Sequence, residues 1–231
     1  MKPRSLALLL SLLVSATPCV AEGDPRDPLE SFNRGVHGFN EGFDKAIFKP
    51  VAEGYKAVMP AFGQTSVRNF FSNLNDVTVL TNDILQLKGE QAIQDFLRLA
   101  FNSTFGLLGL LDVSSEMGLR KHDEDFGQTL GRWGMGSGPY LVLPFLGSSS
   151  LRDTAGLVVD TVYTDPVVQT DDVSDRNVGI GVRMISKRAD LLDAKRTVDE
   201  AALDPYEFMR ELYLERRRSQ VFDGKPPEEK D

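Results

Sequence analysis

Cysteine, histidine and long apolar runs are all scarce in this sequence. Its 231 residues include one cysteine and two histidines. A single cysteine excludes an internal disulfide framework, and two histidines leave little material for a histidine-based metal centre or catalytic site. After residue 21 no stretch reaches 18 consecutive apolar residues. The sequence therefore predicts no membrane-spanning helix.

Positive charge is also in deficit. The formal net charge is -8, and it becomes -10 when the two cations of the N-terminal leader, Lys2 and Arg4, are left out. An acidic surface repels phosphate backbones, so we expect no nucleic-acid partner. It also disfavours binding to anionic lipid through a general basic field. With 41 % hydrophobic residues, any attachment to a membrane has to be mainly hydrophobic.

The residues of common catalytic and cofactor motifs do not come together in this sequence. His122 precedes three acids, but four adjacent side chains cannot all face one metal ion from a helix. Ser137 lies between glycines without the Gly-x-Ser-x-Gly spacing, and no histidine follows His122 in the chain. The glycine-rich stretch 127–147 lacks the endings of phosphate-binding loops. We expect no enzyme, no cofactor and no metal.

The N-terminus reads as a signal peptide over residues 1–21. Lys2 and Arg4 precede an apolar stretch that is too short to span a bilayer. Pro18, directly before Cys19, fits lipoprotein processing poorly, whereas ordinary cleavage after Ala21 has small residues at the required positions. We favour cleavage after Ala21; acylation of Cys19 is the alternative.

Helical spacing dominates the rest of the chain, and strand-like alternation is scarce, which predicts an all-α fold. Asp27-Pro28-Leu29-Glu30 is typical of a helix start, and Asp204-Pro205-Tyr206-Glu207 repeats it. We expect a loop around Pro50 and Pro60 and a helix from about Glu90. One apolar stripe follows the first start signal, with spacings of three and four: Leu29, Phe32, Val36, Phe39, Phe43 and Ile47.

Two further segments have an unusual composition, and the first leaves two interpretations open. Residues 99–113 form the most apolar part of the chain after the leader, and they predict either a buried core helix or a segment lying in one leaflet. Residues 127–147 predict a flexible, apolar loop bounded by proline. We place one helical domain at residues 22–222 and a charged, disordered tail at residues 223–231.

Several long motifs resemble one known family, the VacJ family, also called MlaA. They are DPLESFNR (27–34), KPVAEGY (49–55), NFFSNLND (69–76), FNSTFGLLGLLDV (101–113), DFGQTLGRWGMGSGPYLVLPFLG (125–147), LRDTAGLVVD (151–160) and DPYEFMRE (204–211). Together they extend over most of the chain after the leader, in one order.

The resemblance implies a ring-like helical domain embedded in the periplasmic leaflet of the cell outer membrane, with an amphipathic central channel. It implies removal of mislocalised phospholipids from the outer leaflet and their transfer to a periplasmic carrier protein, which maintains lipid asymmetry. The implied partners are phospholipid, a trimeric outer-membrane porin and that carrier. Family members are typically lipoproteins, and the leader departs from this pattern at Cys19. A scaffold that only braces porins, without transport, is the alternative function.

A lipid path needs polar groups for the headgroup beside apolar walls for the chains. Asparagines interleaved with phenylalanines meet this need, so we predict polar wall positions at Asn33, Asn40, Asn73 and Asn102 and apolar ones at Phe39 and Phe43. A gate needs a hinge, which we place in residues 131–138. The glycines of this hinge are Gly131, Gly134, Gly136 and Gly138.

Overall fold

The computed structural model describes residues 24–227, and within this range the chain is mostly helical. The elements are α2 (Glu30–Phe43), the π-helical turn η1 (Asp44–Phe48), α3 (Lys49–Val58), α4 (Ala61–Leu85), α5 (Gly89–Thr104), α6 (Val113–Glu116), α7 (Phe126–Arg132), β1 (Tyr140–Leu143), β2 (Gly147–Ser150), α8 (Leu151–Tyr163), α9 (Val173–Asp190), α10 (Leu192–Ala201) and α11 (Pro205–Val221). The predicted helical class is confirmed, with one short hairpin added. The predicted signal peptide and Cys19 lie outside the described residues.

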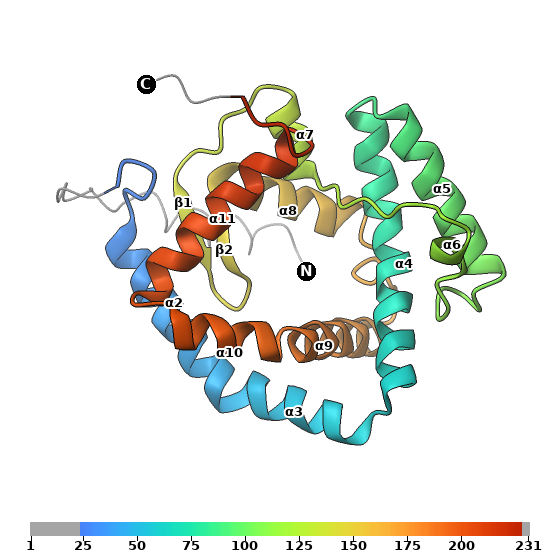
Figure 1. Ribbon diagram of the computed structural model, residues 1–231, viewed down its shortest axis with the longest axis horizontal. Coiled ribbons are helices and arrows are strands. Elements are labelled where there is room, and N and C mark those ends of the chain that lie inside the picture. The colour runs from blue at the N-terminus through green and yellow to red at the C-terminus, as the bar shows by residue number, and fades with distance from the viewer. Residues whose placement is uncertain (1–23, 228–231) are drawn as a thin grey trace.

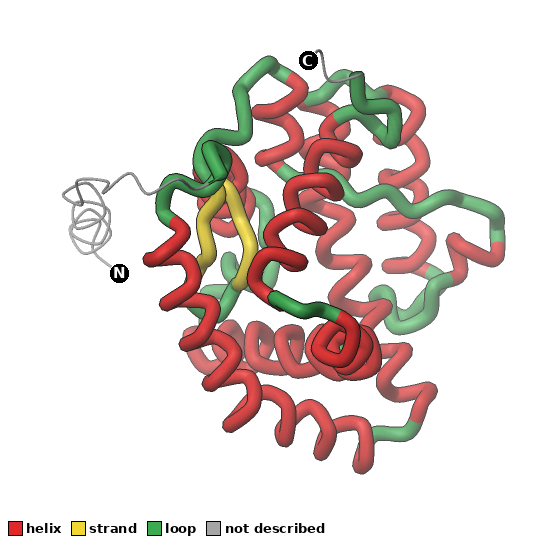
Figure 2. The backbone as a smooth tube through the Cα atoms, turned by 60° about the vertical axis from the view of Figure 1, so that its left-hand side comes forward, coloured by secondary structure: helices red, strands yellow, loops and turns green. Residues whose placement is uncertain are grey.

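The helices follow one another around the middle of the molecule, as the predicted ring requires. Figure 1 shows α2 and α3 along the lower left, α4 on the right, and α7, α8 and α11 above. Helices α9 and α10 lie inside α3, and α5 and α6 lie outside α4. Figure 2 shows the two short strands between α2 and α11, which contact β1 and β2 respectively. Between residues 24 and 227, no helix combines the length and apolarity needed to cross a membrane.

Helices α2 and α3, which η1 joins without a break, differ from the prediction at two places. Helix α2 begins after Leu29, and Asp27 does not cap it, because the Asp27 side chain is turned into the protein. Pro50, where we predicted a loop, lies in the first turn of α3. Proline fits there because its missing N–H is not needed at a helix start. Asp204, in the second start motif, does cap α11, since its carboxylate accepts from the N–H groups of Tyr206 and Glu207.

The prediction of a buried core helix over residues 99–113 is wrong, and the alternative of a segment lying in one leaflet stays a prediction. Helix α5 ends at Thr104, and a tight turn leads to α6, which Asp112 caps. Leu107, Leu108 and Gly109 have positive φ angles in this turn, 52°, 60° and 91°. A Cβ on Gly109 would lie 2.6 Å from the Asn73 side chain, so only glycine allows this close approach to α4.

The glycine-rich segment 127–147 is only partly the loop that we predicted. Its beginning forms α7, and its end forms the hairpin, in which Tyr140 pairs with Ser150 in antiparallel register. Gly127 and Gly156 let α7 and α8 touch, because a Cβ on Gly156 would lie 2.3 Å from the Gly127 nitrogen. The first residue of the predicted disordered tail, Asp223, contacts the rest of the protein. It forms an ion pair with Lys88 of the α4–α5 turn at 2.5 Å.

Candidate lipid-contact surface

Helix α5 presents its apolar stripe outward and its charges inward. Ile93 is 64 % exposed and Phe96 is 55 % exposed. Asp95, Arg98 and Asn102, which lie on the other side of the helix, are buried. In a water-soluble protein the stripe would face the core. The reversed orientation suits a helix whose outer face meets an apolar medium.

The same reversal extends over the described part of the chain. Thirty-four large hydrophobic side chains are exposed, whereas eight hydrophobic side chains are buried. Twenty-two polar or charged side chains are buried, more than twice the number of buried hydrophobic ones. Exposed apolar area costs about 25 cal/mol per Å² in water. The surface is therefore built for contact with apolar partners, and the interior is held together by polar bonds.

Arg217 joins three elements of this polar interior. Its guanidinium binds Asp125 at 2.6 Å and Asp153 at 2.9 Å, and Tyr213 donates its hydroxyl to Asp153 at 2.6 Å. Burial alone would raise the pKa of Asp153, but the hydrogen bonds and positive charge of Arg217 outweigh it and lower that pKa to about 2. Asp153 is therefore ionised at neutral pH, and α7, α8 and α11 are tied together.

Arg98 and Asn102 form a second polar cluster where α5 meets α6. The Arg98 guanidinium binds both oxygens of Asp112 and the Leu119 carbonyl. Asn102 donates to Asp112 and accepts from the Ser114 N–H at 3.0 Å. The structure thus uses both polar ends of the predicted headgroup residue Asn102 inside the protein. Its contact with lipid stays a prediction.

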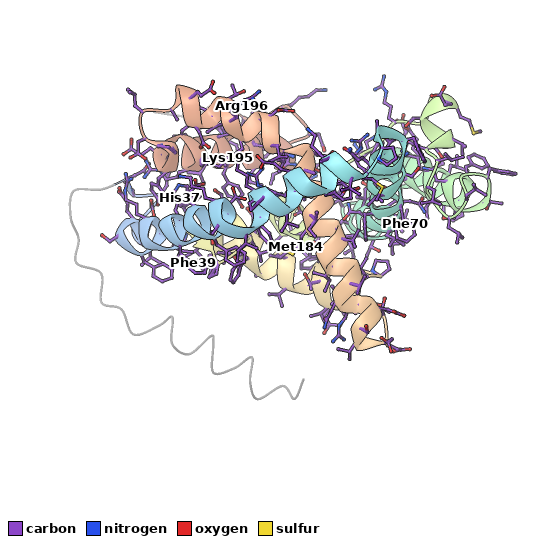
Figure 3. All side chains as sticks on the ribbon, turned by 90° about the horizontal axis from the view of Figure 1, so that it is seen from below. His37, Phe39, Phe70, Met184, Lys195 and Arg196 are labelled. Atoms are coloured by element: carbon purple, nitrogen blue, oxygen red, sulfur yellow. The ribbon has the colours of Figure 1, made fainter. Side chains whose placement is uncertain are left out.

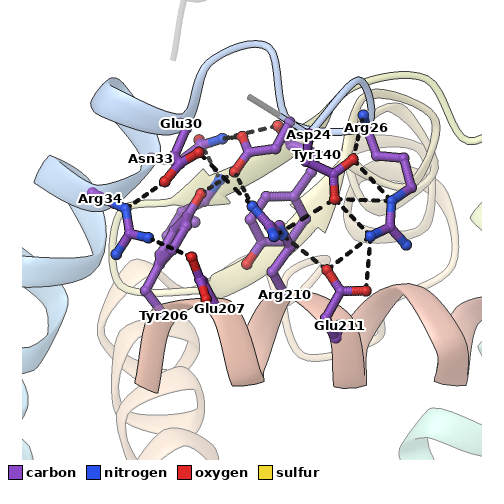
Figure 4. Close-up of polar contacts among 12 residues, drawn as sticks. Asp24, Arg26, Glu30, Asn33, Arg34, Tyr140, Tyr206, Glu207, Arg210 and Glu211 are labelled. Carbon is purple, nitrogen blue, oxygen red and sulfur yellow. Dashed lines mark hydrogen bonds and ion pairs between the residues drawn. The ribbon is translucent and has the colours of Figure 1, made fainter. Parts of the chain in front are cut away.

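A third cluster joins the beginning of the described chain to its last helix (Figure 4). Asp27 accepts from Asn33, Tyr206 and Arg210. Burial and the hydrogen bond to Asp27 raise the pKa of the Tyr206 hydroxyl, which keeps it protonated as a donor. Asn33, another predicted headgroup position, also donates to the Tyr140 carbonyl and accepts from the Val142 N–H. This cluster fastens α2, the hairpin and α11 to one another.

Phe39, Asn40 and Phe43 come together at the tip of the hairpin. The ring of Phe145 lies 5.3 Å from that of Phe39 and 4.9 Å from that of Phe43, edge to face. Asn40 donates to the Leu143 carbonyl and accepts from the Phe145 N–H at 2.8 Å. Phe145 has a positive φ of 65°, and Asn40 holds it there. Figure 3 shows Phe39 on the side of α2 opposite His37.

An open apolar groove of about 500 Å³ runs beside these rings. No charged residue lines it. The lining residues are Ser31, Phe32, Gly35, Val36, Phe39, Pro144 and Phe145.

The four predicted hinge glycines have different surroundings. Gly131 lies in α7, and a Cβ there would meet Arg152 at 2.8 Å and Val221 at 2.9 Å. Gly134 and Gly138 have positive φ angles of 95° and 68°, and Gly136 has open space around it. The structure therefore gives Gly131 a packing position and leaves the other three in the loop between α7 and β1. Their role in gating stays a prediction.

Two features of this surface were missed from the sequence. One is Phe145, whose contact with α2 depends on the hairpin. The other is the set of buried charges. Asp95, Arg98 and Asn102 repeat at spacings of three and four, as the apolar residues of the same helix do, so a second, polar stripe was present in the pattern. Among residues 24–227, the structure has no group of three or more His, Cys, Asp or Glu side chains placed to hold a metal ion.

Comparison with known proteins identifies one family. Residues 25–220 match the family model described as MlaA lipoprotein. A Shigella flexneri protein named intermembrane phospholipid transport system lipoprotein MlaA is 34 % identical over 92 % of this chain and 85 % of its own length. The Haemophilus influenzae protein of the same name is 30 % identical over 100 % of this chain and 96 % of its own.

A solved structure supports the same conclusion. It comes from work on the structural basis for maintenance of bacterial outer membrane lipid asymmetry. It superposes with a TM-score of 0.74 at 33 % identity, and the match includes 86 % of this chain and 99 % of that chain. The helical ring is therefore the fold of this family.

Proposed function

This chain belongs to the MlaA lipoprotein family, and on that premise we propose that it removes mislocalised phospholipids from the outer leaflet of the outer membrane and passes them to a periplasmic carrier. The relatives carry the name of an intermembrane phospholipid transport system, and the solved relative comes from work on outer-membrane lipid asymmetry. The observation that carries the proposal for this chain is the reversed helix orientation, with Phe96 outside and Asp95 inside.

The exposed apolar side chains suit a position in the periplasmic leaflet. No described helix is long and apolar enough to cross the bilayer, so the ring would lie within one leaflet, with its apolar belt against acyl chains. A lipid would cross through an amphipathic channel in the ring, its headgroup beside polar groups and its chains beside rings such as those of Phe39 and Phe43. The groove of about 500 Å³ beside Phe39 falls within the usual size of small-molecule sites.

Two protein partners complete the proposal. A trimeric porin would hold the ring in place, and a periplasmic carrier would receive the lipid. Export by the leader 1–21 would deliver the chain to this side of the envelope. The alternative is a scaffold that braces porins and moves no lipid.

The experiment compares outer-leaflet phospholipid in a deletion strain and in the same strain complemented with the wild-type gene. Intact cells are labelled with an amine reagent that does not cross membranes, and labelled phosphatidylethanolamine is quantified. Transport predicts several-fold more label in the deletion strain and a return to normal on complementation. Unchanged labelling, with the porin still co-purifying, would favour the scaffold.

A further inference from the structure

Two buried carboxyl groups face each other near the C-terminal end of α4. Asp83 of α4 and Asp95 of α5 are both fully buried, and their carboxyl groups are in contact. Neither carboxyl oxygen of Asp83 accepts a hydrogen bond from any donor, and Oδ1 of Asp95 accepts none. This arrangement is unusual, because a buried carboxylate without a donor is costly.

The charged groups packed around Asp83 and Asp95 form ion pairs or hydrogen bonds with residues other than Asp83. From the segment between α6 and α7, which crosses α4 in Figure 1, His122 contacts Asp95 Oδ2 at 2.6 Å. Glu124 of the same segment pairs with Lys88 of the α4–α5 turn at 2.7 Å. Each neighbouring acid therefore has its own cation or imidazole, and Asp83 has none.

Two touching carboxylates cannot both stay ionised in a dry interior, so one of them keeps a proton. With the proton in place, the O–H of one carboxyl donates to an oxygen of the other, so a hydrogen bond replaces the repulsion between two charges. Burial raises the pKa of Asp83 to about 8. The hydrogen bond and charge of Asp95 and the charge of Glu124 add to the rise, whereas the charge of Lys88 opposes it. The protonated pair is the form present near neutral pH.

We propose that one proton shared by Asp83 and Asp95 fastens the end of α4 to α5, and that loss of this proton loosens this end of the helical hairpin. Once deprotonated, the pair repels itself without a solvent screen. The hairpin carries exposed apolar side chains, among them Leu87, Ile93 and Phe96. The proton therefore controls how firmly this apolar arm is held, whether or not the protein moves lipid.

The only tryptophan of the sequence, Trp133, contacts the last turn of α4 and can report on its movement. Trp133 donates its indole N–H to the carbonyl of Leu85 at 3.3 Å. Leu85 lies two residues from Asp83, in the last turn of α4. Movement of this turn changes the surroundings of the indole, so tryptophan fluorescence follows it.

The experiment records this fluorescence from about pH 6 to pH 9.5, with the chain after residue 21 in detergent micelles. The wild type should show a single transition centred near pH 8. Asp83→Asn keeps an N–H donor for Asp95 and has no proton to lose, so its signal should stay flat. The control is Glu90→Gln, an exposed change in the first turn of α5, which should keep the wild-type transition.

A flat wild-type signal, or an unchanged transition in Asp83→Asn, would overturn the proposal. If Asp83→Asn loses its helical circular dichroism, carbon-13 spectra of wild-type aspartates replace it. One carboxyl titrating near pH 8 supports the shared proton, whereas titration of every carboxyl below about pH 5 overturns it. A midpoint that moves on adding EDTA or calcium means that a cation, and not a proton, sits between the two groups, and this also overturns it.

Discussion

Arg217 neutralises two buried carboxylates at once. Its side chain is 12 % exposed, whereas that of the next residue, Arg216, is 68 % exposed. Arg217→Met would leave Asp125 and Asp153 without their cation. Loss of one partner from a buried pair costs about 3–5 kcal/mol. We expect the free energy of unfolding in detergent micelles to fall by about this amount, and Arg216→Met, the matched control, to change it by less than about 0.5 kcal/mol.

The acid pH dependence of this difference has a fixed sign. The pKa of Asp153 is depressed to about 2 in the folded state, from an ordinary value of 3.8. Its stabilisation is thus complete above about pH 4 and is lost as the pH falls toward 2. The difference between wild type and Arg217→Met should shrink over that interval. A difference that is constant from pH 7 down to pH 2 would contradict the role given to Arg217.

At the residue scale, composition alone could not assign the asparagines. Asparagine beside phenylalanine in the sequence suggested a wall for headgroups, but Asn33 and Asn40 each bond to the backbone of the hairpin more than 100 residues away. Such partners depend on the tertiary fold, and no local pattern reveals them. The same holds for Gly109, whose positive φ is observed in a tight turn and whose contact with Asn73 depends on the fold.

At the scale of the helices, a substitution on the apolar face of α5 tests whether this face lies outward, against lipid. Phe96 lies at the middle of this face. A charge placed in hydrocarbon costs about 2.5–3.5 kcal/mol, so Phe96→Glu should weaken flotation with phospholipid vesicles by about 2 kcal/mol or more. Phe96→Leu, which keeps the apolar surface, should float like the wild type.

Circular dichroism distinguishes this effect from misfolding. Because Phe96 is 55 % exposed, Phe96→Glu should keep the helical spectrum of the wild type. Equal flotation of Phe96→Glu and Phe96→Leu would mean that α5 does not face lipid.

The sequence predicted the helical class and helices near α2, α5 and α11, but not which way they face. A spacing of three and four identifies a stripe, and the stripe has the same period whether it packs on a core or on lipid. For α5 the opposing stripe of Asp95, Arg98 and Asn102 carried the missing information. The hairpin was missed for a different reason, because Gly147–Ser150 is a strand of small polar residues with no apolar alternation.

For the whole molecule, closure of the ring depends on contacts between distant parts of the chain. The Asp27 cluster joins α2 to α11, and Arg188 pairs with Asp44 at 2.6 Å to join α9 to the turn after α2. Because polar bonds lie inside and apolar side chains outside, we propose that the ring lies in an apolar medium. On this proposal the helices hold the protein in the membrane, with or without an acyl chain.

Membrane retention of Cys19→Ala tests that claim most directly, since this variant has no thiol that an acyl chain could occupy. Isolated outer membranes are washed with high salt and then with alkaline carbonate, and the protein is followed by immunoblot beside a periplasmic marker that confirms export. Apolar surface without a basic field predicts that Cys19→Ala stays in the membrane through both washes and is released by detergent. Release of the exported variant by salt alone would contradict the account.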